Sequence, residues 1–154
     1  MKRRLGRSGI EVSALGMGCW AIGGPWTLVH EEGSRPAGWG RVDDAESIRA
    51  VQAAVDAGIT FFDTAANYGC GHSERILGRA LGRHRRGVVI ATKFGHRIDE
   101  VTKEVHGNDD AIVANLRQDC ENSLARLGTD YIDLYQLHAG RMDPEKALAV
   151  REAL

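Results

Sequence analysis

The stretch Gly58–Gly78, GITFFDTAANYGCGHSERILG, decides the fold, because it contains a helix end, a strand, a polar loop and the start of the next helix. Its apolar run Ile59–Phe62 is rich in β-branched and aromatic residues, which is typical of a short buried strand. Asp63 closes this run, and Tyr68 follows in the loop. Ser73 is predicted to begin the next helix, with an acid in its first turn, where the helix dipole stabilises negative charge.

Strands and helices alternate on both sides of this stretch. A small β-hairpin is expected first, from Arg3–Leu5 and Ile10–Val12 around a Gly-Arg-Ser-Gly turn. The elements predicted after it are a strand at Ser13–Gly18, a helix capped by Asp43 or Asp44 that ends at Gly58, the central strand, a helix at Ser73–Leu81, a strand at Gly87–Thr92, a helix at Asp109–Leu127, a strand at Tyr131–Leu137 and a helix from Pro144. Strands alternating with helices form a parallel sheet with right-handed crossovers, so the sequence predicts an α/β fold.

Two long stretches are interpreted as loops, Cys19–Gly40 and Gly95–Asn108. The first contains all three tryptophans of the chain: Trp20, Trp26 and Trp39. Three large aromatic residues in one loop either pack it onto the body of the protein or form the wall of a binding pocket, and both interpretations remain open. The basic segment Arg83–Arg86 is interpreted as a solvated turn, with an anion site as the lesser alternative.

Composition excludes several classes of protein. With 43% apolar and 27% charged residues and a net charge of −1, the 154 residues suit one globular domain and give no electrostatic case for nucleic acid or an anionic membrane as partner. The three cysteines form no CxxC pair, which argues against disulfides and a zinc site and for a reducing compartment. Without a membrane-spanning apolar run or a signal peptide, a cytoplasmic protein is expected.

Polar residues close consecutive predicted strands. Asp63, Lys93 and His138 each end an apolar run, and Tyr68 lies in the loop after the first of these runs. Because the carboxyl ends of parallel strands share one edge of a sheet, and because alternate positions point to the same side, we expect these four side chains to meet. The alternative is an Asp63–Lys93 ion pair that only stabilises this edge.

Such a set suits proton donation to a carbonyl group. A free tyrosine hydroxyl has a pKa of about 10, too high for efficient donation at neutral pH, and a neighbouring ammonium lowers it. A carboxylate would hold that ammonium, and a histidine would orient the carbonyl oxygen. A hydride or another nucleophile must then attack the carbonyl carbon. No side chain supplies hydride, so hydride transfer requires a nicotinamide cofactor.

Several motifs closely resemble those of the aldo-keto reductase family. They are LGRSG at Leu5–Gly9, LGMGCW at Leu15–Trp20, DTAANYG at Asp63–Gly69, SERILG at Ser73–Gly78, ATK at Ala91–Lys93 and DLYQLH at Asp133–His138. The resemblance extends over the whole chain, and the motifs match in order and in spacing. It implies a (β/α)₈ barrel of the TIM type and reduction of a small aldehyde or ketone with NADPH, NADH being possible.

The resemblance also implies roles for individual residues. Tyr68 would be the general acid, Lys93 the residue that tunes it, Asp63 the partner of Lys93, and His138 the residue that orients the carbonyl. Residues expected near the cofactor are Gly18, Cys19, Trp20 and Asp63. Residues expected to line the substrate pocket are Trp20, Trp26, Tyr68 and His138. No metal site is expected.

The chain is shorter than such a barrel. A (β/α)₈ barrel takes about 250 residues, whereas residues 1–154 supply an N-terminal hairpin and about four strand–helix units. We therefore expect the N-terminal part of a single barrel domain, with little or no reductase activity alone. A non-catalytic binding or regulatory protein on the same scaffold and a self-associating half-barrel are the alternatives, and the oligomeric state is left open.

Overall fold

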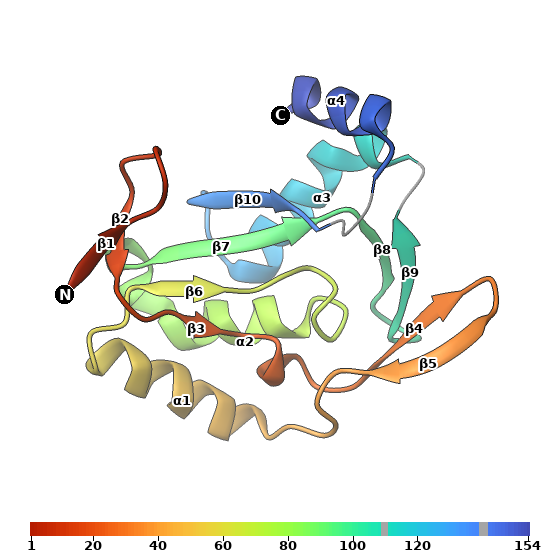
Figure 1. Cartoon of the computed structure of the whole chain (residues 1–154). Coiled ribbons are helices and arrows are strands. Elements are labelled where there is room, and N and C mark those ends of the chain that lie inside the picture. The colour runs from red at the N-terminus through yellow and green to blue at the C-terminus, as the bar shows by residue number, and fades with distance from the viewer. Residues whose placement is uncertain (109–110, 139–141) are drawn as a thin grey trace.

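A four-stranded parallel sheet forms the centre of the molecule in the order β10-β7-β6-β3 (Figure 1). The computed structural model describes residues 1–108, 111–138 and 142–154. The strands are β3 (Met17–Gly18), β6 (Phe61–Asp63), β7 (Val89–Phe94) and β10 (Leu134–Leu137). The helices that follow them in the chain are α1 (Asp44–Asp56), α2 (His72–Leu81), α3 (Ile112–Leu127) and α4 (Pro144–Ala153). The predicted α/β alternation is therefore confirmed, as an open sheet rather than a closed barrel.

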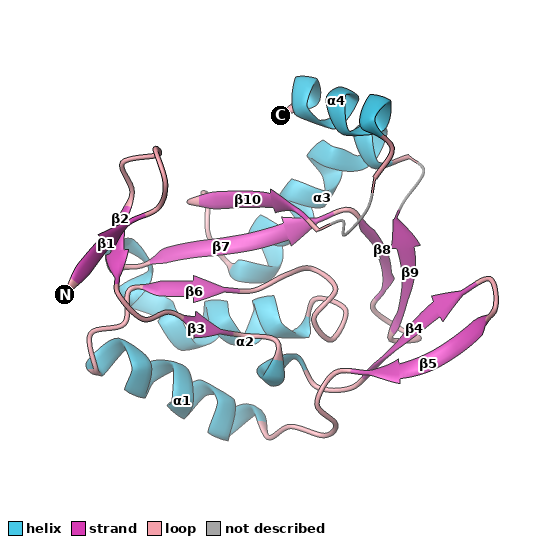
Figure 2. Cartoon of the chain, in the orientation of Figure 1, coloured by secondary structure: helices cyan, strands magenta, loops and turns pink. Residues whose placement is uncertain are grey.

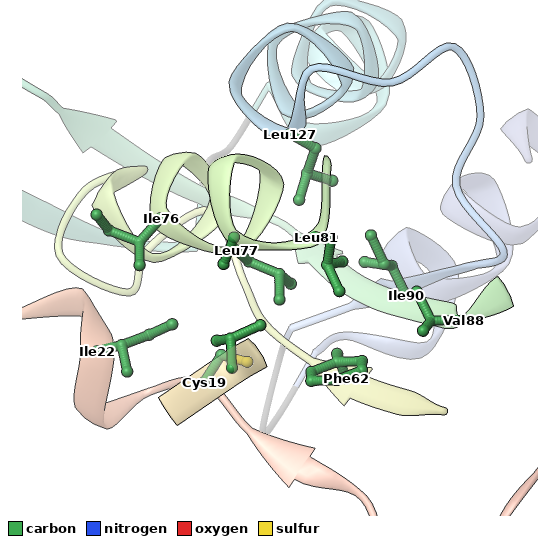
Figure 3. Packing of buried hydrophobic residues seen from close by; sticks show 11 residues of the cluster. Cys19, Ile22, Phe62, Ile76, Leu77, Leu81, Val88, Ile90 and Leu127 are labelled. Carbon is green, nitrogen blue, oxygen red and sulfur yellow. The ribbon is translucent and has the colours of Figure 1, made fainter. Parts of the chain in front are cut away.

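The hydrophobic core lies between the sheet and α2 (Figure 3). Phe62 of β6 and Ile90 of β7 are fully buried and face Ile76 and Leu77 of the helix. Because side chains alternate along a strand, Asp63 and Lys93 lie on the sheet face away from this core, where α2 does not cover them. The core thus fixes which side of the sheet carries the polar residues.

The predicted N-terminal hairpin is confirmed, shifted by about one residue. β1 (Lys2–Arg4) pairs antiparallel with β2 (Glu11–Ser13). Reciprocal bonds of 2.8 and 2.9 Å between Ser13 and Thr60 attach it where β6 begins. The hairpin therefore lies at the end of the sheet opposite to the strands' carboxyl ends (Figure 1).

The two segments predicted as loops are wrong predictions, because both form strands. β4 (Trp26–His30), β5 (Gly33–Ala37), β8 (His96–Asp99) and β9 (Glu104–Asn108) make a second sheet in the order β5-β4-β9-β8, here called the rim sheet. A short 3-10 turn, η1 (Ala21–Gly23), precedes it. Figure 2 shows the rim sheet beyond the arrowheads of the parallel strands. Its central pairing joins β4 to β9, with Leu28 in register with Val105. Because these two strands lie far apart in the sequence, no local pattern predicts this sheet.

The predicted start of α2 is also wrong in detail. The helix begins at His72, and its N-cap residue, Gly71, has no side chain to cap it. Ser73 Oγ instead donates to the Cys19 carbonyl at 2.6 Å and lies 2.9 Å from Thr64 Oγ1. Ser73 therefore joins the helix to the loops that carry the polar residues, rather than capping it.

The acid in the first turn of α2 does more than complement the helix dipole. Glu74 is 0% exposed and accepts bonds of 2.6 Å from both Thr92 Oγ1 and Arg126 Nε. Arg126, on α3, also reaches Ser123 and Glu100. Because a buried carboxylate requires a partner, this ion pair holds α2 against α3 and against the strand that carries Lys93.

The basic segment after α2 is not simply a solvated turn. It lies in a 3-10 helix, η2 (Gly82–Gly87), in which the Arg85 side chain is mostly buried. Arg85 pairs with Asp133 at 2.8 Å and lies 3.8 Å above the centre of the Tyr131 ring. This arginine therefore attaches the start of β10 to the end of α2.

Two predicted helix caps are confirmed. Asp43 accepts from the Glu46 N–H at 2.8 Å at the start of α1. Asp143 accepts from the N–H groups of Glu145 and Lys146, with Pro144 in the first turn of α4. The predicted start of α3 at Asp109 lies outside the described residues, and the described helix begins at Ile112.

Candidate active site

The polar ends of the parallel strands lie at one end of the sheet. Asp63 is the last residue of β6, and Lys93 of β7 pairs in register with Gln136 of β10. His138 follows β10, and its backbone N–H donates to the Phe94 carbonyl at 2.8 Å. The register staggers these side chains along the edge of the sheet. Asp63 pairs with Ala91, two residues before Lys93, and Gln136, the partner of Lys93, lies two residues before His138.

Lys93 connects the acid to the tyrosine. Its side chain is 13% exposed. Its ammonium donates to Asp63 Oδ1 at 2.6 Å, to the Thr64 carbonyl at 2.8 Å and to Tyr68 Oη at 3.3 Å. An ammonium has three donors and no acceptor, so these contacts use its full capacity. The carboxylate and the carbonyl thus hold a positive charge beside the phenolic oxygen.

Tyr68 lies between two other rings. Trp20 is nearly parallel to it, with centroids 6.0 Å apart and planes 24° apart, and His138 stands edge-on at 5.8 Å. The Tyr68 N–H donates to the Ala65 carbonyl at 3.1 Å, inside the loop between β6 and α2. The phenol is therefore oriented by its backbone, by two rings and by the Lys93 ammonium.

His138 is uncharged in this environment. Burial, followed by the nearby His96 and Lys93, lowers the pKa of His138 to about 4, against a smaller opposing effect of Asp63. The ring of His96 is edge-on to that of His138, with centroids 5.1 Å apart. A neutral imidazole has one N–H donor and one acceptor nitrogen, so His138 can donate a single hydrogen bond to a bound oxygen.

The residues predicted to approach the cofactor differ in whether they leave space or a polar group facing the site. Gly18 pairs in register with Asp63, and a Cβ on Gly18 would meet no atom within 4 Å. Cys19 is fully buried, its N–H donates to the Asp63 carbonyl, and its carbonyl accepts from Ser73. Cys19 therefore presents no polar group to the site, whereas Gly18 leaves open space in front of the Asp63 carboxylate.

Of the two tryptophans predicted for the substrate pocket, the structure brings Trp20 beside Tyr68 but not Trp26. Trp26 is 8% exposed and packs with Cys70 and Val105 under the rim sheet, so the structure does not bring it to the site. Trp39 instead stands edge-on to Trp20, with centroids 5.8 Å apart and planes 74° apart. The structure therefore leaves Trp26 away from Tyr68, and places the exposed Trp39 against Trp20.

Sequence reasoning missed three further residues of this region. Thr64 contributes through its backbone carbonyl, which no side-chain pattern reveals. Gln136 could have been found, because it precedes His138 by two positions on the same strand face. His96 belongs to a segment interpreted as a loop. The Oε1 of Gln136 and the Nδ1 atoms of both histidines are buried without a hydrogen-bond partner among the described residues.

The described part of the chain shows neither a cluster of metal ligands nor a membrane-spanning helix. Across residues 1–108, 111–138 and 142–154, no group of three or more potential ligands converges on a metal position. None of the helices described above is both long enough and apolar enough to cross a lipid bilayer.

Three comparisons with known proteins agree with one another. The model of the aldo/keto reductase family matches residues 14–152. An aldo-keto reductase of Bacillus subtilis (strain 168) is 43% identical over 135 residues, which are 85% of this chain and 35% of that protein. The holo form of an aldo-keto reductase from Bacillus halodurans matches with a TM-score of 0.78 at 32% identity, over 99% of this chain and 44% of that chain. An aldo-keto reductase of Klebsiella pneumoniae in complex with NADPH matches with a TM-score of 0.64 at 28% identity, over 94% of this chain and 41% of that chain.

Proposed function

The chain belongs to the aldo/keto reductase family, and from this membership we propose that it carries the catalytic residues of an NAD(P)H-dependent reductase of small aldehydes or ketones. One observation carries the proposal: the Lys93 ammonium lies 2.6 Å from Asp63 Oδ1 and 3.3 Å from Tyr68 Oη. A cation held in this way stabilises negative charge on the phenolic oxygen as its proton leaves.

Each residue then has one role. Tyr68 donates the proton to the carbonyl oxygen, Lys93 stabilises the phenolate that remains, and Asp63 holds Lys93 in place. His138, uncharged at neutral pH, donates a hydrogen bond that orients the carbonyl toward the phenol. Because the rings of Tyr68 and His138 are perpendicular at 5.8 Å, an oxygen bound between them can contact both groups.

The face in front of the sheet fits a nicotinamide cofactor. Gly18 leaves space beside Asp63, whose carboxylate can accept hydrogen bonds from ribose hydroxyls, and Trp20 supplies a flat apolar surface. The Oε1 of Gln136, which is buried and has no hydrogen-bond partner in the described part of the chain, is a further acceptor on this face. A bound nicotinamide dinucleotide would supply the two-electron reductant that the side chains lack.

We further propose that the parallel sheet is part of a (β/α)₈ barrel in the active protein. The outer edges of β3 and β10 have no strand partner within the described residues. The chain also spans 35% and 40% of the lengths of two curated relatives from Bacillus subtilis. Open edges and an uncovered sheet face favour association, so we expect the 154-residue chain alone to reduce carbonyls poorly or not at all.

The experiment joins residues 1–154 to the remaining part of the Bacillus subtilis aldo-keto reductase and measures NADPH oxidation with a panel of aldehydes. Tyr68→Phe should abolish turnover in this chimera while cofactor binding, measured by fluorescence, stays nearly unchanged. Tyr131→Phe is the matched control, because that hydroxyl contacts the Arg85 carbonyl, outside the site. Turnover of Tyr68→Phe within tenfold of the parent chimera would refute the assignment of the acid.

A further inference from the structure

Trp39 is a large aromatic residue that the structure leaves uncovered against Trp20, the ring that lies next to the proposed acid. Its exposed fraction is 68%, and that of Trp20 is 43%, whereas the third tryptophan is buried. The two exposed rings meet edge to face at 5.8 Å, and Trp20 is in turn nearly parallel to Tyr68 at 6.0 Å. The three rings form a continuous aromatic wall, here called the Trp20–Trp39 wall. An exposed apolar patch next to reactive groups is typical of a binding surface.

The backbone next to Trp39 packs closely against Gly24 and the Trp26 ring. A Cβ on the preceding residue, Gly38, would lie 2.3 Å from the Gly24 carbonyl and 3.1 Å from Cδ1 of Trp26. Gly38 also has a φ of +82°, which glycine adopts without strain. The buried Trp26 ring therefore supports the segment that presents Trp39, so its packing role and the exposure of Trp39 belong to one arrangement.

The charges of the side chains around Tyr68 cancel. The Lys93 ammonium is paired with the Asp63 carboxylate at 2.6 Å. His138 is uncharged at neutral pH, because burial lowers its pKa to about 4. A ligand that contacts both the wall and the phenol therefore meets apolar ring faces on the indoles and a neutral set of side chains around Tyr68, which favours an uncharged, flat molecule.

We propose, resting on the function proposed above, that Trp39 is a specificity-determining residue and that the Trp20–Trp39 wall selects uncharged carbonyl compounds carrying an aromatic ring. The carbonyl oxygen lies at Tyr68 and His138, and the attached ring packs on the indoles. A saturated ring of similar size gains burial but not the stacking and edge-to-face contacts, so it binds more weakly.

The test measures binding to the chimera described above, because we expect residues 1–154 alone to associate. Acetophenone is the aromatic probe, cyclohexyl methyl ketone the saturated probe of matched size, and 3-acetylbenzoate the charged probe. The indole N–H signals of Trp20, Trp26 and Trp39 in the ¹⁵N-labelled chimera are assigned by single substitutions to Phe. Acetophenone should shift the signals of Trp39 and Trp20 while that of Trp26 stays in place, and it should bind more tightly than the other two ketones.

Variants decide whether Trp39 selects the ligand. Trp39→Ala should weaken acetophenone binding about tenfold and reduce its advantage over the saturated ketone, and Trp39→Phe should restore most of both. Leu148→Ala, which removes an exposed apolar side chain on α4, is the matched control. An unchanged preference in Trp39→Ala, an equal loss for both ketones, or shifts confined to Trp26 would each overturn the inference. Turnover is not part of this readout, so an inactive chimera would contradict the proposed function alone.

Discussion

Replacing Gly69 by alanine should separate the two loops that hold the aromatic rings of the site. Gly69 follows Tyr68 and has a φ of +63°, and a Cβ there would lie 1.8 Å from the Gly23 carbonyl oxygen in η1. An ordinary contact needs at least 3 Å, so the Tyr68 loop and the turn after Trp20 must move apart by about 1 Å. No side-chain rotation relieves this clash, because both partners are backbone.

The expected cost has two parts. A left-handed conformation costs alanine about 1–2 kcal/mol, and forcing an added methyl group into a packed site costs about 1–3 kcal/mol. Gly58→Ala isolates the first part, because Gly58 has a φ of +84° and its added Cβ would meet nothing within 4 Å. We therefore expect Gly69→Ala to lower the free energy of unfolding by about 2–5 kcal/mol, and Gly58→Ala by about 1–2 kcal/mol.

Urea unfolding of both variants, with the midpoint and slope fitted separately, measures the difference. In the chimera described above, Gly69→Ala should also reduce turnover by about 100-fold, since displacing a reacting group by about 1 Å has effects of that order. Gly58→Ala should leave turnover close to that of the parent. If the two variants lose the same stability, the close approach of Gly69 to Gly23 does not constrain the site, and the reasoning fails.

Three further predictions concern the charged groups. Lys93→Met should reduce turnover of the chimera about 100-fold at pH 7 and alter the shape of its pH–rate profile, because no cation then stabilises the phenolate; an unchanged shape would show that Lys93 does not act on the acid. Arg126→Met should lower the free energy of unfolding by about 3–5 kcal/mol, because it leaves the buried Glu74 carboxylate without a positive partner. Arg75→Met breaks only a partly exposed pair with Glu100 and should lower it by about 0–1 kcal/mol. Equal losses for the two variants in urea unfolding would contradict this prediction. Burial lowers the pKa of His138 from 6.5 to about 4, so the unfolded chain binds the proton first as the pH falls. The free energy of unfolding should therefore decrease from pH 6.5 toward pH 4. A His138→Phe variant whose urea midpoint falls equally over that range would refute this.

The parallel sheet could be predicted because each of its strands and helices has a pattern within its own short stretch of sequence. Strands buried on both faces read as apolar runs, such as Val89–Ile90 of β7, and each run is followed by a helix with a periodic apolar face. Once the strands are parallel, their carboxyl ends must share one edge. The proximity of Asp63, Lys93 and Tyr68 could therefore be anticipated from topology alone.

The rim sheet could not be predicted in the same way. Its strands are short and partly exposed, and β4 pairs with β9, a segment far along the chain, so neither shows a buried run. Composition also cannot say which of several tryptophans faces solvent. Trp26 enters a strand with its side chain buried, while Trp39 follows the hairpin and stays exposed. The register of a sheet that the sequence does not reveal decides between them.

The pairing of β4 with β9 has a consequence for the order of events during synthesis. Thr27–Val29 emerges from the ribosome long before Glu104–His106, so β4 cannot gain its parallel neighbour until the later segment is free. Contacts between distant segments form slowly, because the intervening chain must first be ordered. We therefore expect α1, α2 and the first parallel strands to form an early nucleus on the nascent chain, with the β4–β5 hairpin, which precedes Trp39, docking afterwards. Pulse-labelled hydrogen exchange would then show protection at Phe62 and Ile76 before Leu28 and Val105.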